Sequence, residues 1–232
     1  MKRVVDTPLA APIVDLPRLA PTVPRSGVSE AARLALRQLL GDTDRRIADA
    51  YRDGAPACEL ARARGGAIEH IVAHVWTACI GESSTIALYA VGGFGRGAMF
   101  PYSDVDLLVL CEVAPRGSTV RALESFFTLL WDLGLKPGHA LRTLGECRDL
   151  AAKDATIYTS LLDARRIAGA EALDCGLAAI LDDAQVWPRA AYLAAKQADR
   201  LNRHGRFGDT AYNLEPNLKE GPGGLRDAQT IL

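Results

Sequence analysis

The spacing of apolar residues predicts three regions along the chain. Between residues 29 and 82, leucine, isoleucine, valine and tryptophan recur at helical intervals, which predicts helices over 31–40, 43–52 and 56–80. Ser29 is a suitable N-cap for the first helix, and Gly41 followed by Asp42 is expected to end it. Residues 29–82 are therefore predicted to form a helical N-terminal region.

Short apolar runs replace the helical pattern after residue 82. Residues 85–91 and 105–111 are apolar runs of strand length, and both predict buried strands. A glycine-rich turn is expected at 92–97, an amphipathic helix at 120–133 and a third strand at 138–144. This alternation predicts an α/β (α+β) core at 83–150, a short mixed sheet with helices packed against it.

Helical patterns dominate again from residue 146 onward, with a long helix expected over 186–204. A block dense in Gly, Pro and Asn follows at 209–232, where a new helix is expected at the end. Residues 151–232 are grouped as a helical segment with this block. At the other end, five of the twelve prolines lie in residues 1–28, so this segment is predicted to be a flexible tail.

Composition and charge narrow the class of protein. The 232 residues are 49% apolar and 24% charged, as is typical of a folded globular protein. A net charge of −1 gives no general basic field, so nucleic acid is not an expected partner. No apolar run approaches the roughly 18 residues of a membrane span, so no membrane association is expected. The five scattered cysteines contain no CxxC pair, which favours a reducing compartment, the cytoplasm.

The residues with a chemical signature lie between the first two predicted strands. Asp104 and Asp106 alternate at the start of the second strand, so both carboxylates are expected on one face, about 6–7 Å apart at the backbone. Carboxylates this close repel each other, and a cation between them relieves the repulsion. Carboxylate oxygens suit Mg²⁺, which also accepts phosphate oxygens as ligands. Both residues are therefore predicted to be Mg²⁺ ligands and catalytic.

Four nearby residues complete a predicted nucleotide-binding site. Gly92 and Gly93 have no Cβ, so their backbone can approach a ligand closely and present N–H groups to a phosphate. Arg96 and the hydroxyl of Ser103 are suitable triphosphate partners. A glycine pair alone or an Asp-x-Asp motif alone is common in ordinary loops, whereas the two motifs joined by one short loop indicate nucleotide chemistry.

The glycine pair followed by Asp-x-Asp resembles the DNA polymerase β-type nucleotidyltransferase superfamily. Longer blocks resemble the bacterial PII uridylyltransferase/uridylyl-removing enzymes, namely 93–106 (GFGRGAMFPYSDVD), 131–143 (WDLGLKPGHALRT) and 209–227 (DTAYNLEPNLKEGPGGLRD). The resemblance implies Mg²⁺-dependent transfer of UMP from UTP to a tyrosine of the PII nitrogen-regulatory protein, with release of pyrophosphate. It also implies that PII and UTP are the partners.

The resemblance leaves several points open. The family's full chains continue into an HD hydrolase domain and paired ACT domains, and no His-Asp signature occurs here, so the uridylyl-removing and glutamine-sensing activities are expected to be absent from this chain. The alternatives are another nucleotidyl transfer, such as adenylylation of glutamine synthetase, and a non-catalytic nucleotide-binding regulatory module.

Many superfamily members place a third carboxylate on the strand after the acidic pair, and residues 138–142 contain no acid. Asp163 is the next acid to test, and His139 could serve as a base, although a histidine on a strand is more often structural. Lys219, in the third block, could reach a phosphate, but the block could equally shape a surface between domains.

Overall fold

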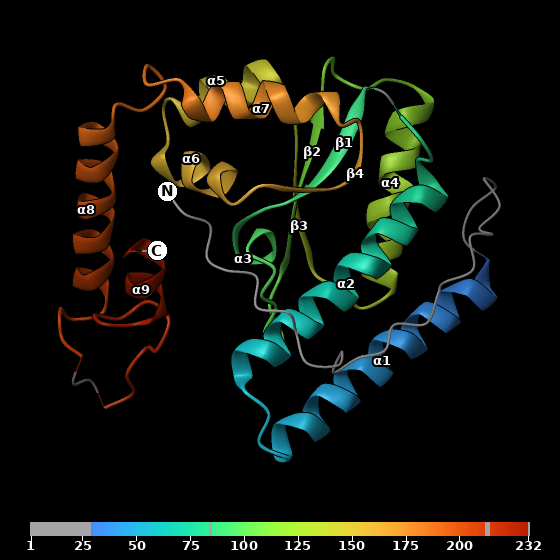
Figure 1. Ribbon diagram of the computed structural model, residues 1–232, viewed down its shortest axis with the longest axis horizontal. Coiled ribbons are helices and arrows are strands. Elements are labelled where there is room, and N and C mark those ends of the chain that lie inside the picture. Colours follow the sequence, from blue (N-terminus) through green and yellow to red (C-terminus); the bar gives the residue numbers. More distant parts are fainter. Residues whose placement is uncertain (1–28, 84, 212–213, 232) are drawn as a thin grey trace.

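A four-stranded mixed sheet forms the centre of the computed structural model, which describes residues 29–83, 85–211 and 214–231 (Figure 1). The predicted tail, residues 1–28, lies outside the described residues. The strand order is β3-β2-β1-β4, with β1 at Ile86–Ala90, β2 at Val105–Cys111, β3 at Pro137–Thr143 and β4 at Arg165–Gly169. β1 pairs antiparallel with β2 and β4, whereas β2 and β3 are parallel. The predicted α/β fold with a short mixed sheet and the three predicted strands are confirmed.

Helices cover both faces of this sheet (Figure 1). One face carries α1 (Glu30–Arg52), α2 (Ala57–Cys79) and α4 (Ser118–Asp132), and α4 also supplies the crossover that a parallel strand pair requires. The other face carries α5 (Leu144–Ala151), α6 (Ala155–Leu162) and α7 (Ala172–Asp182). α8 (Arg189–Arg206) packs against α6, and α9 (Leu225–Ile231) lies beside α8. None of the described helices is long and apolar enough to cross a membrane.

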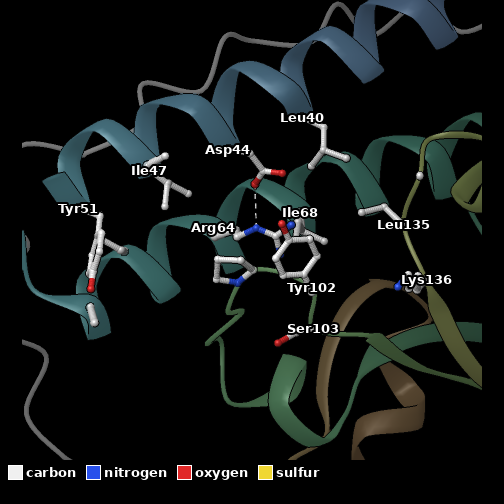
Figure 2. Close-up of a pocket in the computed structure, with 15 residues that line it drawn as sticks. Leu40, Asp44, Ile47, Tyr51, Arg64, Ile68, Tyr102, Ser103, Leu135 and Lys136 are labelled. Carbon is white, nitrogen blue, oxygen red and sulfur yellow. Dashed lines mark hydrogen bonds and ion pairs between the residues drawn. The ribbon is translucent and has the colours of Figure 1, made fainter.

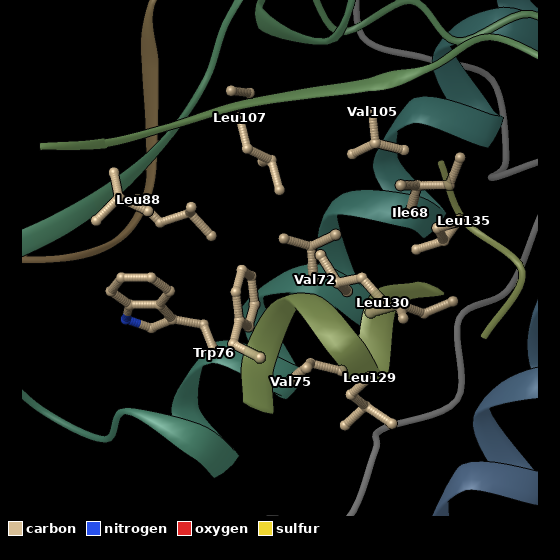
Figure 3. Packing of buried hydrophobic residues seen from close by; sticks show 14 of the residues in the cluster. Ile68, Val72, Val75, Trp76, Leu88, Val105, Leu107, Leu129, Leu130 and Leu135 are labelled. Atoms are coloured by element: carbon tan, nitrogen blue, oxygen red, sulfur yellow. The ribbon is translucent and has the colours of Figure 1, made fainter. Parts of the chain in front are cut away.

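Alternate residues of β2 divide between two cores, because side chains of a strand point to opposite faces. Leu107 and its odd-numbered neighbours face α2 and α4 (Figure 3). There the rings of Trp76 and Phe126 pack edge to face, with their centroids 5.3 Å apart. Leu108 and Leu110 belong to the second core, against α5, α6 and α7. Asp106 has the same parity, so it lies on this second face, at the end of β2.

The predicted helix break at Gly41 is wrong, because α1 runs through this position without interruption. A glycine in a helix interior costs about 1 kcal/mol relative to alanine. Burial of Leu36, Thr43 and Ile47 on one stripe of α1 outweighs that cost. The N-cap prediction is confirmed, since the Ser29 hydroxyl accepts the N–H of the third residue beyond it at 3.2 Å.

The helical pattern expected from residue 146 onward missed strand β4. This strand is five residues long, lies at the sheet edge and is half-buried, so no apolar alternation marks it. Two arginines occupy it, and each is paired: Arg165 binds Glu69 and Arg166 binds Asp174 at 2.9 Å. The glycine-rich turn after β1 also contains one helical turn, α3 (Gly92–Gly95), and the long helix begins three residues later than expected.

Candidate active site

The predicted glycine-rich turn leads from β1 into the site as α3. Gly92 has a φ of +55°, a backbone conformation that favours glycine. Gly95 packs so tightly that a Cβ would lie 2.1 Å from the carbonyl oxygen of Asp163. The N–H groups of Gly95 and Arg96 donate to carbonyls inside the turn. Gly92 and Gly93, the predicted phosphate contacts, precede these bonded residues at the start of the turn.

Asp106 lies at the centre of the site, half-buried on β2. Asp104 is exposed and comes two residues earlier, just before the strand. A Cβ at Gly92 would lie 3.3 Å from Oδ2 of Asp106, and a Cβ at Gly138 would lie 2.8 Å from Oδ1. Glycines on two neighbouring elements therefore provide the space that this carboxylate occupies.

Four charged groups act on one another at this place. Burial raises the pKa of Asp106, and the negative charge of Asp104 raises that pKa further. The positive charges of Lys219 and Arg96 lower the same pKa without cancelling the rise. The two acids are thus close enough to repel each other, as the sequence predicted. The charge of Lys219, whose role the sequence left open, acts on Asp106 although the two residues lie far apart in the sequence.

Arg96 follows α3 and forms an ion pair with Asp163, the residue that caps the end of α6. Nη1 of Arg96 donates to Oδ2 of Asp163, while Nη2 lies 3.9 Å from the position of a Cβ on Gly93. Burial raises the pKa of Asp163, and the charge of Arg96 opposes that rise. Asp163 therefore holds the Arg96 guanidinium above the glycine turn.

A third acid is not assembled beside the pair. Within the described part of the chain, no group of three or more His, Cys, Asp or Glu side chains is placed to hold a metal ion. His139 is in register with Leu107 on the neighbouring strand, and its ring stacks on Phe127 with centroids 4.0 Å apart. The imidazole thus lies on the α4 side of the sheet, on the face opposite Asp106.

Ser103 lines a cavity of about 610 Å³ next to α1, α2 and the loop before β2 (Figure 2). The side chain of Arg64 lies in the cavity wall, where it binds Asp44 at 2.8 Å and the carbonyl oxygen of Phe100 at 3.2 Å. Tyr102 is 91% exposed at a φ of +67°, which is rare for a bulky residue. No spacing in the sequence indicated this cavity, because helices distant from the loop form most of its wall.

Two family models match the chain. Residues 74–159 match the model described as Nucleotidyltransferase domain, which spans the glycine turn, the acidic pair and β3. Residues 191–232 match the model described as GlnD PII-uridylyltransferase, which covers α8 from its third residue, Lys219 and α9.

Curated proteins similar to this chain carry the name bifunctional uridylyltransferase/uridylyl-removing enzyme. The protein from Methylococcus capsulatus is 45% identical over 186 residues, which are 80% of this chain and 21% of the relative. The protein from Xanthomonas campestris pv. campestris strain 8004 is 44% identical over 195 residues, 84% of this chain and 22% of the relative. That from Xanthomonas axonopodis pv. citri is 41% identical over 219 residues, 94% of this chain and 25% of the relative. The chain thus spans 21–25% of the length of these relatives.

Proposed function

The chain contains a nucleotidyltransferase domain and is related to bifunctional uridylyltransferase/uridylyl-removing enzymes, and from this premise we propose that it transfers UMP from UTP to a tyrosine of the PII nitrogen-regulatory protein. The proposal rests mainly on one observation: Asp104 and Asp106 lie close to the glycine turn and Arg96, and all of these residues fall within the match to the domain model. The names of the relatives and of the second family model support the choice of nucleotide and acceptor.

Mg²⁺ is the proposed cofactor, with Asp104 and Asp106 as its protein ligands. The space that Gly92 and Gly138 leave around the Asp106 carboxylate supports this choice. Mg²⁺ binds through one or two carboxylates and completes its coordination with waters and substrate phosphates, so a pair of acids is sufficient. When bound, the ion neutralises phosphate charge and polarises the attacking hydroxyl.

The reaction is an in-line displacement at the α-phosphorus of UTP. A bond forms from the tyrosine oxygen to this phosphorus, the bond to the bridging oxygen breaks, pyrophosphate leaves, and the phenolic proton passes to water. The chain's own residues position charge: Gly92 and Gly93 donate N–H groups to phosphate, and Arg96 presents a guanidinium that Asp163 holds in place. Ser103 is proposed to contact the nucleotide as well. Positioning and charge neutralisation supply most of the catalysis in phosphoryl transfer.

Intact-mass measurement of PII tests the proposal. PII is incubated with this chain, Mg²⁺, ATP and 2-oxoglutarate, with and without UTP, and the Methylococcus capsulatus relative serves as positive control. One uridylyl group per PII subunit, gained only with UTP, is the expected result. A gain of AMP would overturn the choice of base. No gain, beside modification by the control enzyme, would overturn transfer and favour a nucleotide-binding regulatory module.

Substitution of the acidic pair tests the assignment of the site. Asp104→Asn and Asp106→Asn each remove one negative charge and are expected to abolish transfer while thermal unfolding stays near the wild-type temperature. Asp149→Asn is the matched control, because Asp149 is exposed on α5 on the surface of the molecule. Transfer retained by either variant of the pair contradicts the assignment.

The cytoplasm is the proposed location. All five cysteines are free thiols, as expected in a reducing compartment.

A further inference from the structure

β3 forms one edge of the sheet, and its outer side is open. The strand order places β3 at the end of the sheet, where it pairs with β2, and none of the described segments pairs with its other side. Gly138 and His139 are exposed, and Leu141 is 46% exposed. An unpaired strand edge presents N–H and C=O groups that can bond to another extended segment. The edge of β3 is therefore available for pairing.

The register shows which backbone groups of β3 face outward. The N–H of Val105 donates to the carbonyl oxygen of Lys136 at 2.9 Å, and the parallel register then continues without a shift to the end of both strands. Because the bonds of a parallel pair are evenly spaced, the even-numbered residues of β3 bond to β2. The Arg142 carbonyl oxygen lies on that side, where it accepts from the thiol at the end of β2 at 3.2 Å. The N–H and C=O groups of His139 and Leu141 therefore point away from the sheet.

The open stretch of this edge is short. Pro137, at its start, has no N–H to donate. At its end, the N–H of Thr143 donates to the Glu146 carboxylate at 2.7 Å, as part of the cap of α5. Within β3, His139 and Leu141 are thus the residues that offer both backbone groups to a partner. A stretch of this length suits one short extended peptide segment and provides few bonds for joining two whole sheets.

One face of β3 leads from the open edge directly to the acidic pair. Gly138 is in register with Asp106, so both lie on the same face of the sheet. Neighbouring strands are about 4.8 Å apart, so a strand added beside β3 would lie about 10 Å from β2. Because Gly138 has no side chain, an aromatic side chain from the added strand can lie across this position and bring its end to the site of Asp106. The edge is therefore continuous with the candidate active site.

We propose that the free edge of β3 docks the acceptor protein: an extended segment of PII adds beside β3, bonds to the backbone of His139 and Leu141, and directs the acceptor tyrosine across Gly138 to the acidic pair. The inference rests on the proposed transfer to PII and adds the surface that the acceptor uses. Backbone bonds hold the segment, and the space over Gly138 admits its side chain. The continuity of this edge with the acidic pair favours the acceptor over a second copy of this chain, because the acceptor is the partner that must reach the acids.

Hydrogen exchange of the wild-type chain, resolved at single amides by NMR, tests the docking surface. The chain is measured alone and with PII, in Mg²⁺, ATP, 2-oxoglutarate and α,β-methylene-UTP, an analogue that cannot release pyrophosphate. With PII, the outward amides of His139 and Leu141 should exchange at least about ten-fold more slowly, whereas the inward amides of Ala140 and Arg142 are already bonded and should change little. Uniform or absent protection of β3 overturns the proposal. Alternate protection that rises with the concentration of this chain without PII overturns it as well, because a second copy then occupies the edge.

Proline substitution tests the backbone bonds through activity. Leu141→Pro removes one outward N–H and keeps the bonds to β2, and an edge strand tolerates proline at such a position. KM for PII should rise roughly three- to ten-fold, the effect of losing one hydrogen bond, while the affinity for UTP measured by calorimetry stays at the wild-type value. Leu141→Ala keeps the N–H, so its KM for PII should rise less. Equal rises in the two variants, or no rise in Leu141→Pro, overturn docking through the backbone.

The docking surface and the transfer reaction can fail separately. Alternate protection of β3 by PII, without modification of PII, would contradict the transfer reaction and support the docking surface. Modification of PII without alternate protection would contradict the docking surface and leave the transfer reaction standing. A wild-type chain that neither modifies PII nor gains protection from it overturns both.

Discussion

Replacement of Gly138 by alanine is a direct test of the space around Asp106. The two residues are neighbours in the parallel register of β2 and β3. The added Cβ would lie 2.8 Å from Oδ1 of Asp106, whereas an ordinary carbon–oxygen contact is about 3.3 Å, so the carboxylate must move by about 0.5 Å. Its other oxygen faces Gly92, whose Cβ position is 3.3 Å away, so retreat in that direction is limited.

The displacement should reduce activity far more than stability. Misplacement of a catalytic group by about 1 Å lowers rates about a hundred-fold, so we expect kcat/KM for UTP to fall roughly ten- to a hundred-fold. The atom that must move is the end of a side chain, and alanine itself gains about 0.5–1 kcal/mol over glycine inside a strand. The melting temperature should therefore change by less than about 4 °C.

Steady-state uridylylation of PII and thermal unfolding, measured on the same preparations, provide the test. Gly145→Ala is the matched control, because a Cβ at Gly145 meets no heavy atom within 4 Å. Wild-type kcat/KM in Gly138→Ala would refute the reasoning. A loss of activity that only follows unfolding of the variant would refute it too.

Three further predictions concern charges and thiols elsewhere in the chain. Asp163→Ala releases Arg96 and should therefore raise KM for UTP roughly ten-fold, while the Mg²⁺ dependence of the activity stays unchanged. If the variant instead needs more Mg²⁺ for activity, Asp163 is a metal ligand. Burial raises the pKa of Cys147 to about 11 and also raises the pKa of Cys111, so a thiol reagent should modify the exposed Cys58 and Cys175 rapidly and the buried pair only in denaturant. Burial acts to raise the pKa of Asp227, but hydrogen bonds from Arg203, Gly223 and His204 outweigh it and hold this pKa at about 2. Because the folded-state pKa is depressed, the Asp227 carboxylate stabilises the fold fully above the unfolded pKa of about 4, and this stabilisation is lost as the pH falls toward 2. In urea titrations, the free energy of unfolding of Asp227→Asn should therefore fall less steeply between these two pH values than that of the wild type.

Sequence patterns predicted the elements whose burial is one-sided or complete. β1 and β2 are almost wholly buried, and α2 carries a long apolar stripe, so their apolar spacing identified all three. β4 was missed because an edge strand with Arg165 and Arg166 depends on acids from other elements, and no local pattern records them. Gly41 misled the helix prediction because local propensity is weaker than the burial of one helix face.

In the site, too, the sequence revealed the residues that are close together in the chain but not the contacts between distant segments. Asp104, Asp106 and the glycine turn lie within one short stretch, so their spacing revealed them. The ion pair of Arg96 with Asp163 and the charge effect of Lys219 involve segments that are distant in the sequence. Sequence reasoning identified these residues as candidates but could not say which of them meet. His139 was a poor candidate for the same reason, since only the register of β3 shows which face it occupies.

The packing around Asp106 leaves no room for an acid at position 138 of β3. No side chain fits at position 138 without displacing that carboxylate, so a third acid there would compete with the pair for the same space. The remaining acid near the turn, Asp163, is neutralised by Arg96. The cluster contains three acids, Asp104, Asp106 and Asp163, and two cations, Arg96 and Lys219, so it carries an excess of negative charge. A divalent cation would reverse that sign and create an attractive site for a triphosphate, so the charge balance itself favours joint binding of metal and nucleotide over binding of either alone.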